Sequence, residues 1–97
     1  MSIVWVVYDI AENKARTKVS NACINSGLYR VQKSVFLGTL SPNEQDELAL
    51  KCGEIIDPNV DSVYIFPMDQ QSFKSVKMLG QAFNKDLVTD KVRALFF

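Results

Sequence analysis

The chain has 97 residues, 47% of them hydrophobic, and its 11 basic and 11 acidic side chains leave no net charge. This length supports one hydrophobic core and therefore a single domain over residues 1–97; with no membrane-length apolar stretch and no signal peptide, we expect a soluble cytoplasmic protein without a membrane partner. The chain has no histidine, which excludes imidazole bases, Ser–His–Asp triads and most zinc sites, so catalysis would use other polar side chains or a metal held by oxygen.

Residues 2–9 (SIVWVVYD) are predicted to form a central strand. The unbroken apolar run from Ile3 to Tyr8 is typical of a strand covered on both faces, or covered on one face and paired with another subunit on the other. The run ends at Asp9, and because a lone charge is costly to bury, we place Asp9 where the strand emerges into solvent. Polar groups can converge on a ligand at such a strand end, although an aspartate there also begins turns and caps helices.

Residues 13–26 are predicted to form a helix, with Asn13 as its N-cap and Gly27 as the residue that ends it. Cys23 in this helix and Cys52 further on lack metal-type spacing, and we expect both to be small core residues in a reducing compartment.

Two antiparallel strands are expected next, over residues 28–31 and 35–40. Residues 32–34 between them are predicted to be a tight connection or a bulge. Gly38 suggests a bulge or a close backbone approach.

Residues 41–56 are predicted to form a second helix, because Ser41-Pro42-Asn43-Glu44 is a capping box. The apolar stripe of this helix is expected to include Ala49.

Residues 61–68 follow as a strand, and the alternation in Phe73–Leu79 predicts a fifth, more exposed strand at an edge. We expect the edge strand and tail, residues 73–97, to pack on a partner subunit, since an apolar C-terminus rarely remains uncovered.

The order β-α-β-β-α-β plus one C-terminal strand predicts an α+β fold, the ferredoxin-like sandwich. Both helices then cover one face of the sheet, and a homodimer through the other face is the simplest cover for it.

Charge is uneven along this chain: residues 1–40 carry five basic and two acidic groups, a net of +3, whereas residues 41–61 carry one basic and six acidic groups, a net of −5. The basic segment surrounds Asp9 and permits contact with nucleic acid.

Three motifs resemble a known family when taken together: Tyr8-Asp9-Ile10, Asn13-Lys14-Ala15-Arg16, and residues 27–38 (GLYRVQKSVFLG). At these spacings, in a chain of fewer than 100 residues, they resemble the small endonuclease-like proteins of the CRISPR spacer-acquisition machinery, the Cas-two family. The resemblance covers essentially the whole chain.

The resemblance implies a homodimer that hydrolyses phosphodiester bonds with Mg²⁺ or another divalent cation such as Mn²⁺, in single-stranded RNA or duplex DNA. It implies that Asp9 is the catalytic, metal-binding residue, and a single carboxylate per chain becomes a plausible site where two copies meet across a dimer axis. The other positions tied to the site are Lys14, Arg16, Arg30, Lys33 and Ser34 as nucleic-acid-binding residues and Tyr8 and Phe36 as supporting residues.

Two of these positions keep a structural alternative, since Phe36 can be a core residue and Arg30 a surface strand arginine. Ala15 stands where family members often have a basic run, which lowers the expected phosphate-binding charge.

Other functions fit part of the pattern. The family also implies a non-catalytic scaffold that binds duplex DNA through its backbone and partners the CRISPR spacer integrase. A regulatory ferredoxin-like module would explain the fold but leaves the basic segment near Asp9 as a coincidence. An RNA-recognition motif is disfavoured because residues 35–40 lack its aromatic signature.

Overall fold

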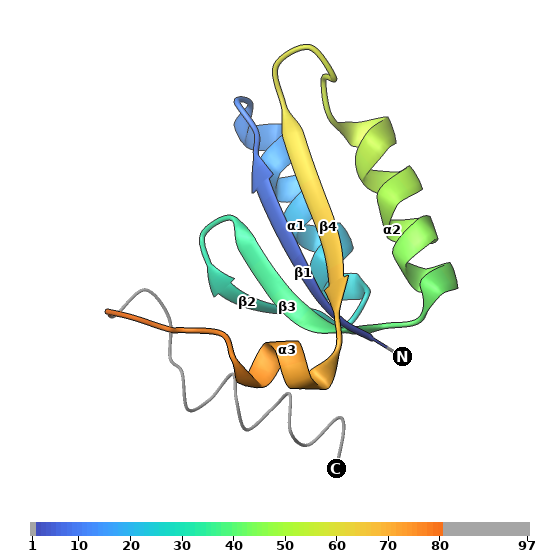
Figure 1. The fold of residues 1–97 in the computed structure, drawn as a ribbon. Helices are drawn as coiled ribbons and strands as arrows, with labels where there is room; N and C mark the ends of the chain where they lie inside the picture. Colours follow the sequence, from blue (N-terminus) through green and yellow to red (C-terminus); the bar gives the residue numbers. More distant parts are fainter. Residues whose placement is uncertain (1, 81–97) are drawn as a thin grey trace.

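Within residues 2–80, which are those that the computed structural model describes, two long helices cover one face of a four-stranded antiparallel sheet (Figure 1). In chain order the elements are β1 (Ser2–Asp9), α1 (Asn13–Asn25), β2 (Tyr29–Gln32), β3 (Val35–Leu40), α2 (Pro42–Ile55), β4 (Ser62–Met68) and α3 (Gln70–Lys74). The strands lie in the order β2-β3-β1-β4. The predicted ferredoxin-like sandwich is therefore confirmed.

Strand β1 is central, because it pairs with β3 on one side and with β4 on the other. Its even-numbered side chains, including Val4, Val6 and Tyr8, lie in the core beneath the helices. Ile3 and Trp5 point to the other face and form a second, smaller cluster there. Side chains alternate along a strand, so an apolar run with no polar alternation fits a strand buried on both faces.

Helix α1 begins one residue earlier than its predicted cap implies. Asn13 is the first helical residue, and the N-cap position belongs to Glu12, whose side chain makes no capping hydrogen bond. At the other end Gly27 has φ +89°, the left-handed conformation that glycine adopts without strain. Cys23 is fully buried in the core, and burial raises the pKa of its thiol to about 12.

The tight connection predicted over residues 32–34 forms at Lys33 and Ser34, and a bulge lies just before it in β2. A register shift between Arg30 and Gln32 places an extra residue in β2, as in a β-bulge. Gly38 in β3 lies against Leu28, where an added Cβ would come within 3.2 Å of the Leu28 Cα atom and within 2.7 Å of its Cδ2 atom. The close backbone approach expected at Gly38 is therefore confirmed.

Helix α2 begins with the predicted capping box. The Ser41 hydroxyl accepts a hydrogen bond from the Glu44 N–H at 3.2 Å, and the Ser41 N–H donates to Glu44 Oε1 at 2.8 Å. Leu48 and Cys52 face the core. Ala49 was wrongly placed in the apolar stripe and is exposed, because the helix buries a narrower face than predicted.

The fifth strand predicted over Phe73–Leu79 does not form within one copy of the chain, and the packing of this segment on a partner subunit stays a prediction. Residues 70–74 are helix α3, and residues 75–79 belong to no strand. The Asp69 side chain caps this helix by accepting a hydrogen bond from the Ser72 N–H at 2.6 Å. Phe73 and Val76 then point together at the second core cluster, a spacing of three residues that suits a helical turn and not a strand.

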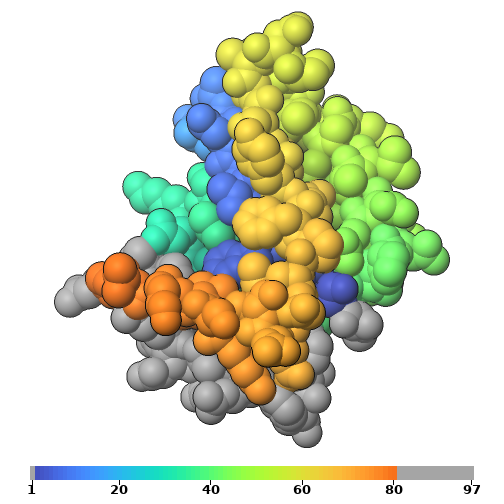
Figure 2. Space-filling model, viewed as in Figure 1, coloured from blue at the N-terminus to red at the C-terminus, as the bar shows by residue number. Residues whose placement is uncertain are grey.

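The sheet face opposite α1 and α2 is only partly covered by α3. Figure 2 shows atoms of β4 exposed along this face. Tyr64 is 62% exposed and Phe66 is 40% exposed, with the Phe66 ring stacked 6.4 Å from that of Trp5. We call this surface the open face. The tail predicted to pack on a partner lies mostly in residues 81–97, outside the described residues.

Candidate nucleic-acid and metal site

Asp9 is the last residue of β1 and is exposed. It is still in register with Ser62 of β4, so strand alternation directs its side chain to the open face, opposite to Tyr8. Within the described residues the Asp9 carboxylate makes no hydrogen bond or ion pair. The fold thus leaves its oxygens available for a cation or another ligand.

Tyr8, on the other side of the strand, is 5% exposed and connects β1 to the β2–β3 turn. Its N–H donates to the Ser34 carbonyl at 3.1 Å, and its hydroxyl donates to the Lys33 carbonyl at 3.3 Å. Burial raises the pKa of Tyr8 above its ordinary value of 10.0, and the nearby charge of Arg30 only partly offsets this effect. Tyr8 therefore stays protonated and is a packed residue that links the end of β1 to the β2–β3 turn.

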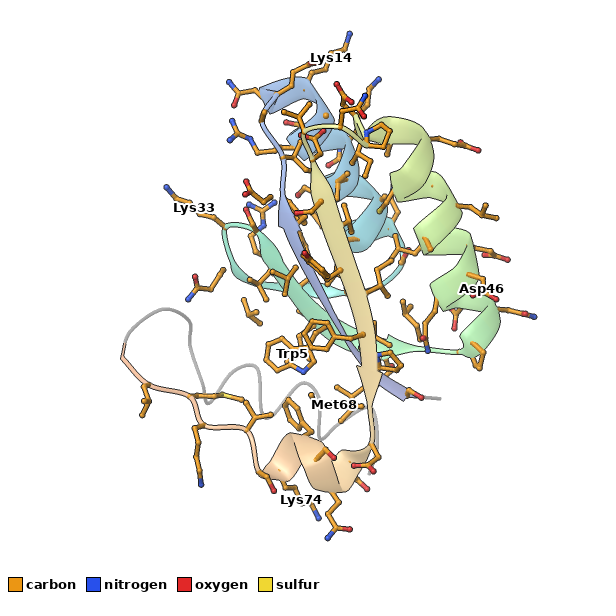
Figure 3. All side chains as sticks on the ribbon, turned by 45° about the horizontal axis from the view of Figure 1, so that its top comes forward. Trp5, Lys14, Lys33, Asp46, Met68 and Lys74 are labelled. Atoms are coloured by element: carbon orange, nitrogen blue, oxygen red, sulfur yellow. The ribbon has the colours of Figure 1, made fainter. Side chains whose placement is uncertain are left out.

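Lys33 and Ser34 form the turn between β2 and β3. The two bonds from Tyr8 hold this turn beside the end of β1, so Lys33 and Ser34 lie at the same end of the sheet as Asp9. Figure 3 shows Lys33 extending away from the sheet. Within the described residues Lys33 makes no salt bridge. Its ammonium group can therefore contact a phosphate without breaking one.

Arg30 and Phe36 lie on the helix side of the sheet, away from the open face. The Arg30 guanidinium carbon stands 5.1 Å from the centre of the Phe36 ring, and its NH2 group donates a hydrogen bond to the buried Ser20 hydroxyl of α1. Phe36 itself is 0% exposed. Phe36 is therefore a core residue that offers no surface to a base, and Arg30 is held by a cation–π contact.

Arg16 and Lys14 lie in the first turns of α1, which starts close to the end of β1, and both are exposed. Lys14 and Lys18 line a hollow of about 370 Å³ together with the acidic residue Asp61. Figure 3 shows Lys14 at the tip of α1. Lys14 thus shares a hollow with an acidic side chain, whereas Arg16 and Lys33 do not line that hollow.

Asp61 is a residue that the sequence reading missed. Its Oδ1 accepts a hydrogen bond from the Ala11 N–H and its Oδ2 accepts one from the Asp57 N–H, each at 3.0 Å. These bonds lower the pKa of Asp61 below its ordinary value of 3.8. The sequence shows only an aspartate before a strand, and nothing in it indicates that the carboxylate reaches a loop 50 positions away.

A metal site within one copy would have to be built largely on Asp9. In the described part of the chain, no three side chains of His, Cys, Asp or Glu come together as ligands. Magnesium accepts one or two carboxylates when waters or phosphate oxygens complete its shell. An exposed, unpartnered carboxylate fits that requirement, and a second Asp9 from another copy would improve it.

Comparison with known proteins gives a consistent picture. Residues 1–76 match the family described as CRISPR associated protein Cas2. A relative from Archaeoglobus fulgidus, named CRISPR-associated endoribonuclease Cas2 1, is 36% identical over 86 residues, which are 89% of this chain and 90% of that protein. The crystal structure of Streptococcus pyogenes Cas2 at pH 6.5 superposes with a TM-score of 0.70 at 29% identity, covering 80% of this chain and 99% of that one.

A third relative is longer. The protein from Thermoproteus tenax named CRISPR-associated endonuclease Cas1/endonuclease Cas2 fusion is 36% identical over 69 residues, which are 71% of this chain and 26% of that protein. Among residues 2–80 of the present chain, no helix has the length and hydropathy to cross a membrane.

Proposed function

Because the chain belongs to the CRISPR-associated Cas2 family, we propose that it is a nucleic-acid-binding homodimer that hydrolyses phosphodiester bonds in a metal-dependent reaction at Asp9. The observation that carries this proposal is the exposed Asp9 carboxylate, which ends the central strand and has no partner within the described residues. The A. fulgidus relative is named an endoribonuclease, so single-stranded RNA is the first substrate to test, with duplex DNA as the second.

A homodimer through the open face supports the chemistry as well as the packing. Tyr64 and Phe66 are exposed on that face, and exposed apolar surface of this kind marks a contact site. Asp9 points to the same face by alternation. A two-fold axis through the open face would therefore bring two Asp9 carboxylates to one interface, which a single copy cannot provide.

The side chains around Asp9 have separable roles in this proposal. Mg²⁺ or Mn²⁺ bound at Asp9 would supply a water of lowered pKa and would offset the charge that develops on the phosphate. Arg16 and Lys33 hold phosphate oxygens and so orient the strand, and the Ser34 hydroxyl donates a further hydrogen bond. Tyr8 keeps the β2–β3 turn, and with it Lys33, next to Asp9.

Cleavage of single-stranded RNA and of short duplex DNA, with and without Mg²⁺, tests the proposal. The native chain is compared with Asp9→Ala and with Asp46→Ala, which removes an exposed carboxylate from α2 instead. We expect metal-dependent cleavage that Asp9→Ala abolishes and Asp46→Ala retains. Cleavage that persists in Asp9→Ala would point to a contaminating nuclease and would refute the Asp9 mechanism.

A second candidate function is a scaffold that binds duplex DNA and the spacer integrase without cleaving. The T. tenax relative, in which a Cas2 segment is part of a Cas1/Cas2 fusion, favours this candidate. Backbone binding needs only spaced cations such as Arg16 and Lys33. Salt-sensitive duplex binding that is equal in the native chain and in Asp9→Ala, with no cleavage by either, would support the scaffold.

A further inference from the structure

Asp61 joins the two loops that flank the Asp9 end of the sheet. One oxygen of its carboxylate accepts the N–H of Ala11, in the connection from β1 to α1, and the other accepts the N–H of Asp57, in the connection from α2 to β4. Each bond is 3.0 Å long. A single side chain thus bridges two segments that are far apart in the sequence.

The loop that carries Asp61 is itself well braced. The Asp61 N–H donates to the Asp57 carbonyl at 2.8 Å, and the Val60 N–H donates to the same carbonyl at 3.1 Å. The Asp57 carboxylate accepts the Asn59 N–H at 3.0 Å. Residues 57–61 therefore form a compact turn, and the Asp61 oxygen that reaches Ala11 extends from a fixed base.

The connection from β1 to α1 has fewer anchors. Ile10 is buried at 3% exposure and holds one point of it by packing. Ala11 and Glu12 are exposed, and the Glu12 carbonyl already accepts the Arg16 N–H as part of α1. The bond from Ala11 to Asp61 is the polar link that ties this connection to the neighbouring loop, and it lies two residues after Asp9.

We infer that Asp61 is a positioning residue for Asp9: it fixes the Asp9–Glu12 segment against the α2–β4 connection and thereby fixes how the Asp9 carboxylate is presented. This inference rests on the proposed role of Asp9. Asp61 is not a second ligand in this scheme, because both of its oxygens are already hydrogen-bonded whereas those of Asp9 have no partner within the described residues. The Ala11 N–H, followed by that of Asp57, lowers the pKa of Asp61, so the bonds are made to a charged acceptor and are correspondingly strong.

Asp61→Asn tests the inference, since asparagine keeps the shape but turns an NH₂ group toward one of the two N–H donors. Asp69→Asn is the matched control, because Asp69 also accepts a backbone N–H but lies at the opposite end of β4. Asp61→Glu retains the charge and moves the carboxylate outward by one methylene. It separates hydrogen-bond geometry from the loss of charge and serves as the test variant if Asp61→Asn fails to fold.

Two readouts apply. Amide hydrogen exchange at Ala11 should be at least tenfold faster in Asp61→Asn and Asp61→Glu and unchanged in Asp69→Asn. Paramagnetic broadening of the Asp9–Ala11 amide signals by Mn²⁺ should require several-fold more Mn²⁺ in both Asp61 variants. Likewise, half-maximal cleavage should require several-fold more Mg²⁺, with most of the maximal rate regained at saturation, unlike in Asp9→Ala.

Ala11 exchange that is unchanged by the Asp61 substitutions would overturn the inference. The inference would also be overturned if the Asp61 variants exchanged faster at Ala11 but required no more Mn²⁺ than Asp69→Asn, because Asp61 would then be purely structural. If the native chain neither cleaves nor shows Mn²⁺ broadening, the proposed function fails. In that case, the exchange rate of Ala11 alone decides whether Asp61 fixes the segment.

Discussion

At the scale of single residues, Arg30 shows how one bulge changes which face a side chain occupies. In a regular hairpin with a two-residue turn at Lys33 and Ser34, Arg30 would stand opposite Leu37, on the Asp9 side of the sheet. The register shift after Arg30 places it opposite Phe36 instead. The Arg30 guanidinium therefore lies over the Phe36 ring and contacts Ser20 of α1, although the residue is exposed. The role in phosphate binding predicted for Arg30 stays a prediction.

The first prediction concerns the stability that Arg30 contributes. Arg30→Ala removes the cation–π contact with Phe36 and the hydrogen bond to Ser20, each worth roughly 0.5–1.5 kcal/mol. We expect urea denaturation to show a free energy of unfolding lower by about 1–2 kcal/mol. Lys33→Ala, in the exposed turn, is the control and should change it by less than about 0.5 kcal/mol. Equal stability of the two variants would contradict a structural role for Arg30.

Three carboxylates accept hydrogen bonds from backbone N–H groups, and we expect the stability of the fold to decrease at acid pH as these carboxylates are protonated. A bond from the Ser41 N–H holds the pKa of Glu44 below its ordinary value of 4.5. Bonds from the Ala11 and Ser72 N–H groups hold the pKa values of Asp61 and Asp69, in that order, below their ordinary value of 3.8. A carboxyl group with a lower pKa in the folded state contributes stability that is complete above its ordinary value. This contribution is lost as the pH falls through the folded value.

The second prediction is therefore a drop in melting temperature on acidification, beginning near pH 4.5 and continuing below pH 3.8. The triple variant Glu44→Gln, Asp61→Asn, Asp69→Asn should melt at a lower temperature than the native chain at pH 7 and should show a shallower pH dependence. Thermal melts followed by circular dichroism between pH 2.5 and pH 7 check this, with Asp46→Asn as the control. A triple variant whose melts fall as steeply as those of the native chain would assign the acid sensitivity to other groups.

At the scale of elements, local signals predicted what local forces determine. The apolar run of β1, the capping box before α2 and Gly27 after α1 each depend on neighbours in sequence, and all three are confirmed. The strand predicted after β4 was wrong at residues 73–74, which are helical, because the apolar spacing there fits both a strand and one helical turn. The contact of Phe73 with Trp5, with the rings 6.3 Å apart, lies far away in sequence and favours the helix.

The candidate site was predictable only in part, for the same reason. Strand order and alternation place Asp9 at an exposed strand end, as expected from the sequence. The burial of Phe36, the contact of Arg30 with α1 and the bridge from Asp61 to Ala11 depend on contacts between distant segments. No spacing within the sequence encodes those contacts.

At the scale of the whole molecule, exposed lysines lie at both ends, whereas acidic side chains gather on one helix and the loop after it. Figure 3 shows Lys14 at one end of the molecule and Lys74, in α3, at the opposite end. The acidic residues of positions 41–61 fall mainly on α2 and the loop after it. We expect a nucleic acid to approach the Asp9 end, where Arg16 and Lys33 are exposed, and to avoid the acidic helix α2.

The third prediction follows from this arrangement. If Lys33 contacts a phosphate, Lys33→Ala should reduce the slope of log Kobs for duplex binding against log salt concentration by about 1. Lys74→Ala removes the same charge from the opposite end and should leave the slope unchanged. Fluorescence anisotropy across a salt series measures both variants. A larger effect of Lys74→Ala would place the nucleic acid at the α3 end instead.

The fourth prediction joins the open face to the chemistry, because one copy has only one Asp9. Tyr64→Glu places a charge at a position that is 62% exposed on that face, whereas Leu50→Glu does so at one that is 70% exposed on α2. We expect sedimentation velocity to show that Tyr64→Glu is a monomer and that Leu50→Glu remains a dimer. An unpaired charge at a buried contact prevents association. Cleavage should then be lost with the dimer, because one copy supplies only one Asp9. A native chain that sediments as a monomer would refute the shared site.

Subunit mixing tests that shared site without disturbing the interface. After equal amounts of native chain and Asp9→Ala exchange subunits, about one quarter of the dimers carry two Asp9 carboxylates. If both carboxylates are needed, activity falls to about a quarter of that of the native dimer. If each copy acts alone, activity falls only to about half, and the open face would then serve packing and not chemistry.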